Sequence, residues 1–206
     1  MRKSIIVIII VLALVGILLM RGCSTYNTMV SLDEQVSKSW ADVEAVYQRR
    51  LDLVNAIVGT VKGSANFEQS TLEGVINARA KATSITIDPS RMSTEQMAQF
   101  QAAQGELSSA LARLMVVFER YPDLKTTAQF QDLVAELAGS ENRIAQERRV
   151  YNDIVAQYNA YIRRFPQNMF AGMFGFERRA SFSAESGAEK GVVPDFGDFG
   201  NGNKQQ

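Results

Sequence analysis

The chain has 206 residues, 46% of them hydrophobic, and its 22 Lys and Arg residues balance 22 Asp and Glu residues. This composition can bury the core of one domain, and the balanced charge excludes the global basic field typical of nucleic-acid-binding proteins. Histidine is absent and Cys23 is the single cysteine, which excludes an imidazole base, an intrachain disulfide and a thiolate metal cluster. The sequence has no Gly-rich phosphate loop or nucleophile elbow. We therefore expect no cofactor, no nucleic-acid partner and no enzymatic activity.

The N-terminus carries an uncharged apolar run over residues 5–20, with two cations before it and one after it. As a helix this run extends about 24 Å, slightly less than the roughly 30 Å of a bilayer core. Flanking cations that reach the headgroups close most of that gap. We predict that residues 1–25 form a single-pass membrane anchor. Its lipid-facing residues would include Ile5, Ile10, Leu14, Leu18 and Met20.

The charges around the run predict a cytoplasmic N-terminus and a helical domain outside the cytoplasm, because only Arg21 closely follows the run. No small-x-small pattern marks a cleavage site for an ordinary signal peptidase. The alternative is a lipoprotein, since Gly22 immediately precedes Cys23, which would carry the lipid. Arg21 departs from the bacterial lipoprotein signal.

Residues 26–62 form the first predicted helix of the domain, with apolar residues at a nearly constant helical period. Its buried stripe would contain Val36, Trp40, Val43, Tyr47, Val54, Ile57 and Val61. Arg50 occupies one step where an apolar residue is expected. Gly63 interrupts the pattern, and Asn66 is the expected cap of a second helix that ends near Thr83.

The third predicted helix begins with a capping box of Ser93 and Gln96, and Pro122 ends it. The fourth begins near Thr126 or Thr127. Its heptad series is Phe130, Leu137, Ile144, Tyr151, Tyr158 and Phe165. Short connections between the helices predict an up-down four-helix bundle over residues 26–165.

The dipeptide Tyr-Asn occurs at residues 26–27, 151–152 and 158–159. Tyr151 and Tyr158 occupy core positions of the fourth helix, one heptad apart, so periodicity favours a structural seam over a ligand site. The hydroxyl groups would reach the rim of the core, where a hydrogen-bond partner can be found. Asn152 and Asn159 lie beside the seam, and the sequence does not identify their partners.

Charged residues interrupt the stripes of the two long helices at matching levels. If these helices run antiparallel with their ends aligned, Arg50 lies opposite Glu141, and Asp42 lies opposite Arg148. We predict that both pairs are inter-helix ion pairs. Polar layers of this kind fix the register of a bundle while adding little net stability.

Several segments together resemble the LemA family. In chain order they are YNTMV, RRLDLVNAIVGTVKG, ARAKA, YPDLKT, RRVYNDIVAQYNAYIRRFP and MFGF, between Tyr26 and Phe182. The resemblance implies an all-helical bundle tethered to a bacterial membrane by its N-terminus, and it implies no reaction. The sequence lacks the histidine that the family often has near Phe67, so a shared metal or acid-base site there is not expected.

Residues 166–180 follow the fourth helix and would lie beside the membrane if that helix returns antiparallel to the first. Apolar residues are dense here and are bracketed by arginines, a composition typical of interfacial segments. We predict contact with the membrane or a partner through Phe165, Met169, Phe170, Met173, Phe174 and Phe176. The alternative is that the segment caps the open end of the bundle. Residues 181–206 are rich in Gly and polar residues and are predicted to be disordered.

The sequence thus favours a membrane-tethered, non-enzymatic scaffold or interaction protein of the bacterial inner membrane. Its expected partners are membrane lipid and unidentified envelope proteins, with self-association as a further expectation. An alternative of another class is an enzyme that uses a carboxylate such as Glu141 or Glu147 in a cleft between helices.

Overall fold

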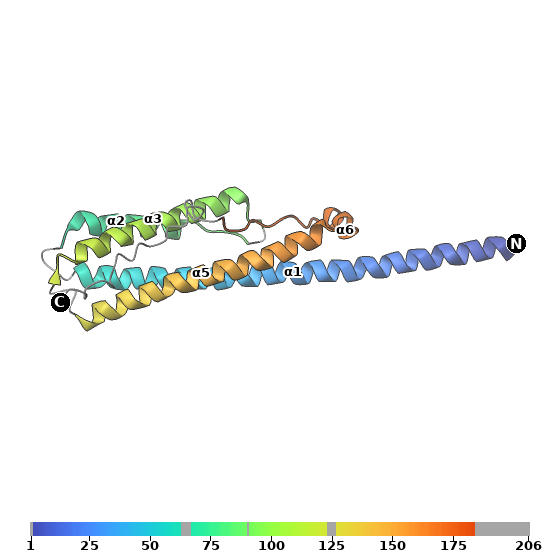
Figure 1. Cartoon of the computed structure of the whole chain (residues 1–206). Helices are drawn as coiled ribbons and strands as arrows, with labels where there is room; N and C mark the ends of the chain where they lie inside the picture. Colours follow the sequence, from blue (N-terminus) through green and yellow to red (C-terminus); the bar gives the residue numbers. More distant parts are fainter. Residues whose placement is uncertain (1, 63–66, 90, 123–126, 184–206) are drawn as a thin grey trace, which may run out of the picture.

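The computed structural model describes residues 2–62, 67–89, 91–122 and 127–183, and the regular elements of these residues are all α-helices (Figure 1). The prediction of an all-helical chain is confirmed. In chain order the helices are α1 (Arg2–Lys62), α2 (Gln69–Ser84), α3 (Thr94–Phe118), α5 (Ala128–Arg163) and α6 (Gln167–Phe174).

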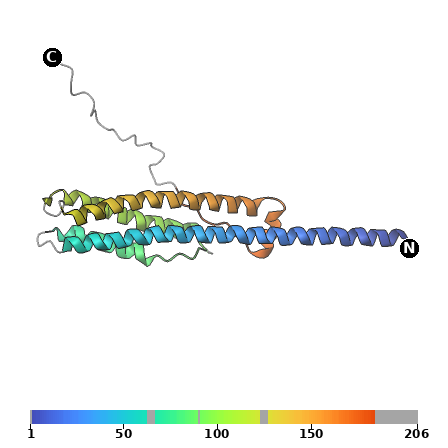
Figure 2. The same ribbon diagram turned by 90° about the horizontal axis from the view of Figure 1, so that it is seen from below.

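The bundle consists of two antiparallel helix pairs (Figures 1 and 2). Helices α1 and α5 lie along each other, and the hairpin of α2 and α3 packs across them. The N-terminal part of α1 extends beyond the bundle alone, and the short helix α6 sits where α1 leaves it. One end of the bundle is therefore marked by a protruding helix with α6 at its base.

Helix α1 is continuous over 61 residues, about 90 Å at the usual helical rise. The sequence assigned residues 1–25 to an anchor and residues 26–62 to the bundle, and one unbroken helix covers both. The physical reason is that residues 2–62 contain no proline, which is the residue that would break a helix interior.

The predicted capping box at the start of α3 is present. The Ser93 hydroxyl accepts from the Gln96 main-chain N–H at 3.1 Å, and the Gln96 side chain accepts from the Ser93 N–H at 3.0 Å. The sequence predicted that the fourth helix begins near Thr126 or Thr127, and Thr127 is the N-terminal cap of α5. Asn66 lies outside the described residues, and α2 begins at Gln69.

The core divides into two clusters along the bundle. One cluster surrounds Trp40 and includes Tyr47, Phe100 and Ile144, whereas the other begins at Leu51. Between the clusters, buried polar residues replace apolar ones on α1 and on α3. They are Arg50 on α1 and Gln104 on α3, with Glu141 at their margin on α5.

Arg50 is the centre of this polar layer, with only 2% of its side chain exposed. One guanidinium nitrogen donates to Ser108 Oγ at 2.6 Å, and Nε lies 2.9 Å from Glu141 Oε1. The N–H of Nε is not aimed at the carboxylate, so this contact is ionic rather than a hydrogen bond. Burial lowers the pKa of Arg50 from its usual value, and the charge of Glu141 opposes that shift.

The second predicted pair does not form. Asp42 is exposed, and no ion pair joins it to Arg148 within the described part of the chain. The Arg148 guanidinium instead donates to the main-chain carbonyl of Ser183 at 3.3 Å and lies 4.9 Å from the ring centre of Phe182. Arg148 therefore contacts residues 182 and 183, which the sequence placed in a disordered tail.

Replacing Arg50 and Glu141 singly and together by Leu tests the polar layer. We expect Glu141→Leu alone to lower the free energy of unfolding, because it leaves a buried guanidinium without its counter-charge. The double variant should recover part of that loss, with a coupling energy of about 1 kcal/mol. Denaturant unfolding of the four proteins measures this cycle, and strictly additive effects would contradict the pairing.

Candidate functional site

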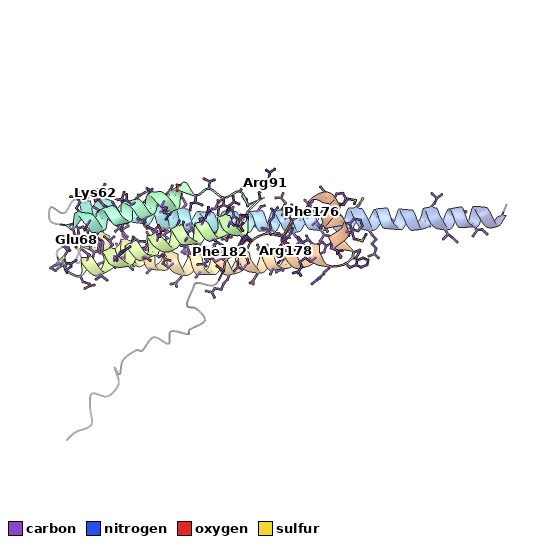
Figure 3. All side chains as sticks on the ribbon, turned by 90° about the horizontal axis from the view of Figure 1, so that it is seen from above. Lys62, Glu68, Arg91, Phe176, Arg178 and Phe182 are labelled. Atoms are coloured by element: carbon purple, nitrogen blue, oxygen red, sulfur yellow. The ribbon has the colours of Figure 1, made fainter. Side chains whose placement is uncertain are left out.

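An extended segment, residues 175–183, follows α6 and runs back along α5; we call it the strap. Figure 3 shows Phe176, Arg178 and Phe182 in succession along its path away from α6. The reversal occurs at Gly175, whose φ of 76° lies in the left-handed region that only glycine adopts without strain. The N–H of Phe176 then donates to Ala171 O at 2.9 Å and closes the end of α6.

Each asparagine of the Tyr-Asn pairs on α5 binds one residue of the strap through both ends of its amide. Asn159 accepts from the N–H of Arg179 and donates to its carbonyl, each at 2.9 Å. Asn152 binds Phe182 in the same way, accepting at 2.8 Å and donating at 3.1 Å. The two amides therefore act as a neighbouring strand would, by satisfying both the N–H and the C=O of two strap residues that lie three positions apart.

The tyrosines complete this arrangement. The Tyr158 hydroxyl donates to Glu177 O at 2.9 Å, and the Tyr151 hydroxyl donates to Ala180 O at 3.0 Å. Together the two Tyr-Asn pairs make six hydrogen bonds to the main chain of the strap. We call these four side chains, Tyr151, Asn152, Tyr158 and Asn159, the clamp.

The heptad spacing of the clamp matches the repeat of an extended chain. Seven residues of helix rise about 10.5 Å, and three residues of extended chain cover about 10 Å. Because the strap runs antiparallel to α5, the Tyr151-Asn152 pair meets it three residues further along than the Tyr158-Asn159 pair does. This match explains why the dipeptide recurs at a spacing of seven. The sequence placed both tyrosine hydroxyls at the rim of the core but did not identify the strap as the partner of the tyrosines or the asparagines.

Phe182 fills an aromatic pocket where three helices meet. Its ring stacks on Trp40 of α1 at 6.0 Å and meets Tyr151 of α5 edge-on at 5.5 Å, with Phe100 of α3 at 6.4 Å. Phe182 is only 5% exposed. The predicted disordered tail of residues 181–206 therefore begins too early, because burial of this ring fixes residues 181–183; residues 184–206 lie outside the described residues.

Arg179 ties the strap to α1. Its guanidinium binds Asp33 Oδ1 through two nitrogens, at 2.7 and 3.1 Å, and lies 5.8 Å from the ring centre of Tyr158. Both charged side chains are largely withdrawn from solvent, with 11% and 27% of their surface exposed. In addition to the hydrogen bonds that the clamp makes to its main chain, the strap is therefore bound through two of its side chains. Arg179 binds an ionic pocket at Asp33, and Phe182 binds an aromatic pocket at Trp40.

The clamp tyrosines are held in their neutral form. Burial is the main cause that raises the pKa of both Tyr151 and Tyr158 from 10.0 to about 12. For Tyr158 the carboxylate of Asp33 adds to the rise, whereas the Arg179 guanidinium opposes it in both cases. Neutral hydroxyls are what the clamp needs, because only they donate to carbonyl oxygens.

The second feature of this end of the molecule is an apolar face on and beside α6. Phe165, Met169, Met173 and Phe174 leave between 47% and 80% of their surface exposed. Phe170 and Phe176, which the sequence placed in the same set, are half-buried against the core. Two of the six residues therefore pack on the bundle, whereas the other four remain accessible.

Helix α6 is seated on α1 just after the N-terminal apolar run. The ring of Phe170 approaches Gly22 so closely that a Cβ there would lie 3.3 Å from a ring carbon. One helical turn later Tyr26 packs edge-on against Phe174 at 4.9 Å and Phe176 at 5.8 Å. The first Tyr-Asn dipeptide therefore contacts α6 and the strap through the ring of Tyr26.

In the part of the chain that the structure describes, no helix has the length and apolarity that a membrane crossing requires. Of the predicted anchor residues, Ile10 is 53% and Met20 is 70% exposed. The side chains of Ile5, Leu14 and Leu18 lie outside the described residues. Cys23 is a free, exposed cysteine beside the seat of α6.

The carboxylates that an enzyme would need are not gathered in one place. Glu141 contacts Arg50, and its spacing from Glu147 on α5 is not the three or four residues that bring side chains to one face. A cavity of about 980 Å³ opens between the strap and the start of α3, lined by side chains of both charges that include Asp33, Arg91 and Glu95. Among the described residues, no group of three or more His, Cys, Asp or Glu side chains is arranged to hold a metal ion.

Comparison with known proteins agrees with the motifs and the fold. The model of the LemA family matches residues 39–196, from the buried Ser39-Trp40 pair to beyond the strap. The chain belongs to the LemA family. It is similar to magnetosome proteins MamQ 1 and MamQ 2 of Paramagnetospirillum magneticum, each 26% identical over 200 residues that cover 89% of this chain and 72% of theirs. Protein LemA of Metamycoplasma hominis is 25% identical over 158 residues, covering 77% of this chain and 68% of its own length.

The clamp can be tested by truncating one amide. We expect Asn152→Ala to lower the free energy of unfolding by about 1–3 kcal/mol, because it leaves the N–H and C=O of Phe182 in a partly buried site without partners. Asn142→Ala, at an exposed position of the same helix, is the matched control and should change it by less than about 0.5 kcal/mol. Equal effects of the two substitutions in denaturant unfolding would contradict the role of the clamp.

The raised tyrosine pKa values predict a loss of stability at alkaline pH. Because the folded state favours the neutral phenols, their contribution is fully present below pH 10.0 and is lost as the pH rises towards about 12. Titration of tyrosinate absorbance should show two late-ionising groups, one of which disappears in Tyr151→Phe and the other in Tyr158→Phe. Ionisation of both residues at the ordinary tyrosine pKa of 10.0 would show that they are not buried.

Proposed function

We propose that this LemA-family chain is a non-enzymatic helical interaction module attached to a bacterial membrane by its N-terminus, with α6 resting on the bilayer surface. The observation that carries the proposal is the position of the exposed apolar face of α6. It lies at the base of the protruding helix, where Phe170 packs on Gly22, two residues after the apolar run ends at Met20. A membrane that holds residues 5–20 would meet this face.

The support for attachment itself comes from the sequence of residues 5–20, which contains no charged residue. A continuous α1 transmits the orientation of that run to the bundle, because no turn separates the two. The cation distribution around the run favours a cytoplasmic N-terminus, and the bundle would then stand outside the cytoplasm.

The charges near α6 suit a bilayer surface. Arg163, Arg164 and Arg178 are exposed on either side of the apolar face. Guanidinium groups pair with lipid phosphates while neighbouring aromatic and methionine side chains enter the acyl boundary. The same arrangement would serve if Cys23 carried a lipid, since this exposed residue lies beside the seat of α6. The intact mass of the protein extracted from membranes distinguishes an acylated chain that begins at Cys23 from an unmodified anchor.

Site-directed labels test whether α6 meets the bilayer. In full-length protein carrying Cys23→Ser, we would place an environment-sensitive fluorophore at Phe174→Cys and, as a control, at Val116→Cys, which is 71% exposed on α3. In vesicles that contain anionic lipid, we expect a blue shift and quenching by a bilayer-embedded nitroxide at residue 174 only. Equal, water-like emission from both positions would contradict contact between α6 and the membrane.

A further inference from the structure

The strap resembles a bound peptide more than an integral part of the bundle. Six hydrogen bonds join the clamp to the main chain of residues 177–182, as in β-strand-addition modes of peptide recognition. Side-chain selectivity comes from two pockets, Asp33 for an arginine and the Trp40 pocket for an aromatic ring three residues later. We propose that the strap is an exchangeable ligand, so that the clamp of one chain receives the strap of a second copy.

The occupant is specified by these two pockets. In the whole sequence Arg179 is the one arginine that a phenylalanine follows three residues later. The strap of a second copy can occupy the whole site, with its main chain at the clamp, its Arg179 in the ionic pocket and its Phe182 in the aromatic pocket. The contacts of an exchanged strap are therefore those of the closed monomer, and association requires no new surface.

The connection to the rest of the chain permits exchange. The strap joins α5 only through α6, and the hinge at Gly175 is exposed and already in a left-handed conformation. Ala171 is the one residue of α6 that is fully buried, so most of the connecting helix lies at the surface of the bundle. When an identical element leaves one protomer and enters another, the contacts balance and the local concentration of chains decides the outcome.

This inference goes beyond the proposed function, because exchange depends on the clamp and strap and not on contact between α6 and lipid. Attachment of many chains to one membrane would raise their local concentration and hold all straps at one height. When the density of chains in the membrane is high, the strap binds the clamp of a neighbouring copy. When the density is low, it binds the clamp of its own chain.

Complementation of two defective chains tests the exchange. The first full-length variant, Asn152→Ala with Asn159→Ala, has an intact strap and a defective clamp. The second, Arg179→Ala with Phe182→Ser, has an intact clamp and a defective strap. With donor and acceptor dyes on Cys23, the exposed native cysteine, we expect little energy transfer within either variant in vesicles and a several-fold rise when they are mixed.

A peptide with the sequence of residues 176–183, FERRASFS, is the competitor, and it should abolish the rise; the same peptide with Arg179 and Phe182 replaced by Ala should not. Transfer in the mixture no higher than in either variant alone, with cooperative melting of both, would overturn the proposal. Strong transfer within one variant alone would also overturn it, because association would then use another surface such as the apolar face of α6.

Should the double variants fail to melt cooperatively, the single variants Asn159→Ala and Arg179→Ala repeat the experiment, since each leaves Phe182 in its pocket. A rise in transfer that is specific to this mixture and sensitive to the peptide supports exchange. Its absence overturns the proposal in the same way.

Discussion

An extended segment in an all-helical protein has no neighbouring strand with which to pair its main chain, and a partly buried N–H or C=O without a partner is costly. Here the clamp meets that constraint. The amides of Asn152 and Asn159 each close a pair of hydrogen bonds with one strap residue, and the tyrosine hydroxyls satisfy the carbonyls of Glu177 and Ala180. The match between seven helical residues and three extended residues lets one straight helix hold the segment over its whole length.

The arrangement of the half of the molecule that contains α6 follows from this interaction. With the strap held along α5, Phe182 closes the pocket of Trp40 and Phe100 and removes a phenyl ring from water, a contribution of about 1.5–3 kcal/mol. Arg179 reaches Asp33 and joins α1 to the strap. The strap in turn fixes the end of α6, which leaves the apolar face of Met169 and Met173 exposed beside α1. The contacts that organise this end are also the ones that we propose a second copy exchanges.

Helix periodicity predicted most of the bundle, because burial of apolar stripes is a local property of the sequence. Tyr151 and Tyr158 are buried at seam positions as expected, and antiparallel alignment of two long helices was enough to place Arg50 opposite Glu141. The clamp was not predicted, because hydrogen bonds from Asn152 reach a segment thirty residues away that lacks any periodic signal. The pairing of Asp42 with Arg148 failed for the same reason, since the strap approaches that arginine. A signal was present, however: two Tyr-Asn dipeptides one heptad apart, followed by an isolated Phe182 within a polar stretch.

Amide hydrogen exchange across the strap, resolved by residue in the full-length protein, tests the central claim most directly. The N–H groups of Arg179 and Phe182 donate to the clamp, whereas none of the contacts described for the strap engages those of Arg178, Ala180 or Ser181. We expect slow exchange at Arg179 and Phe182 and fast exchange at the three residues around them. Uniformly fast exchange over residues 177–182 would show that the strap is not held, and uniform protection would show that burial rather than the clamp holds it.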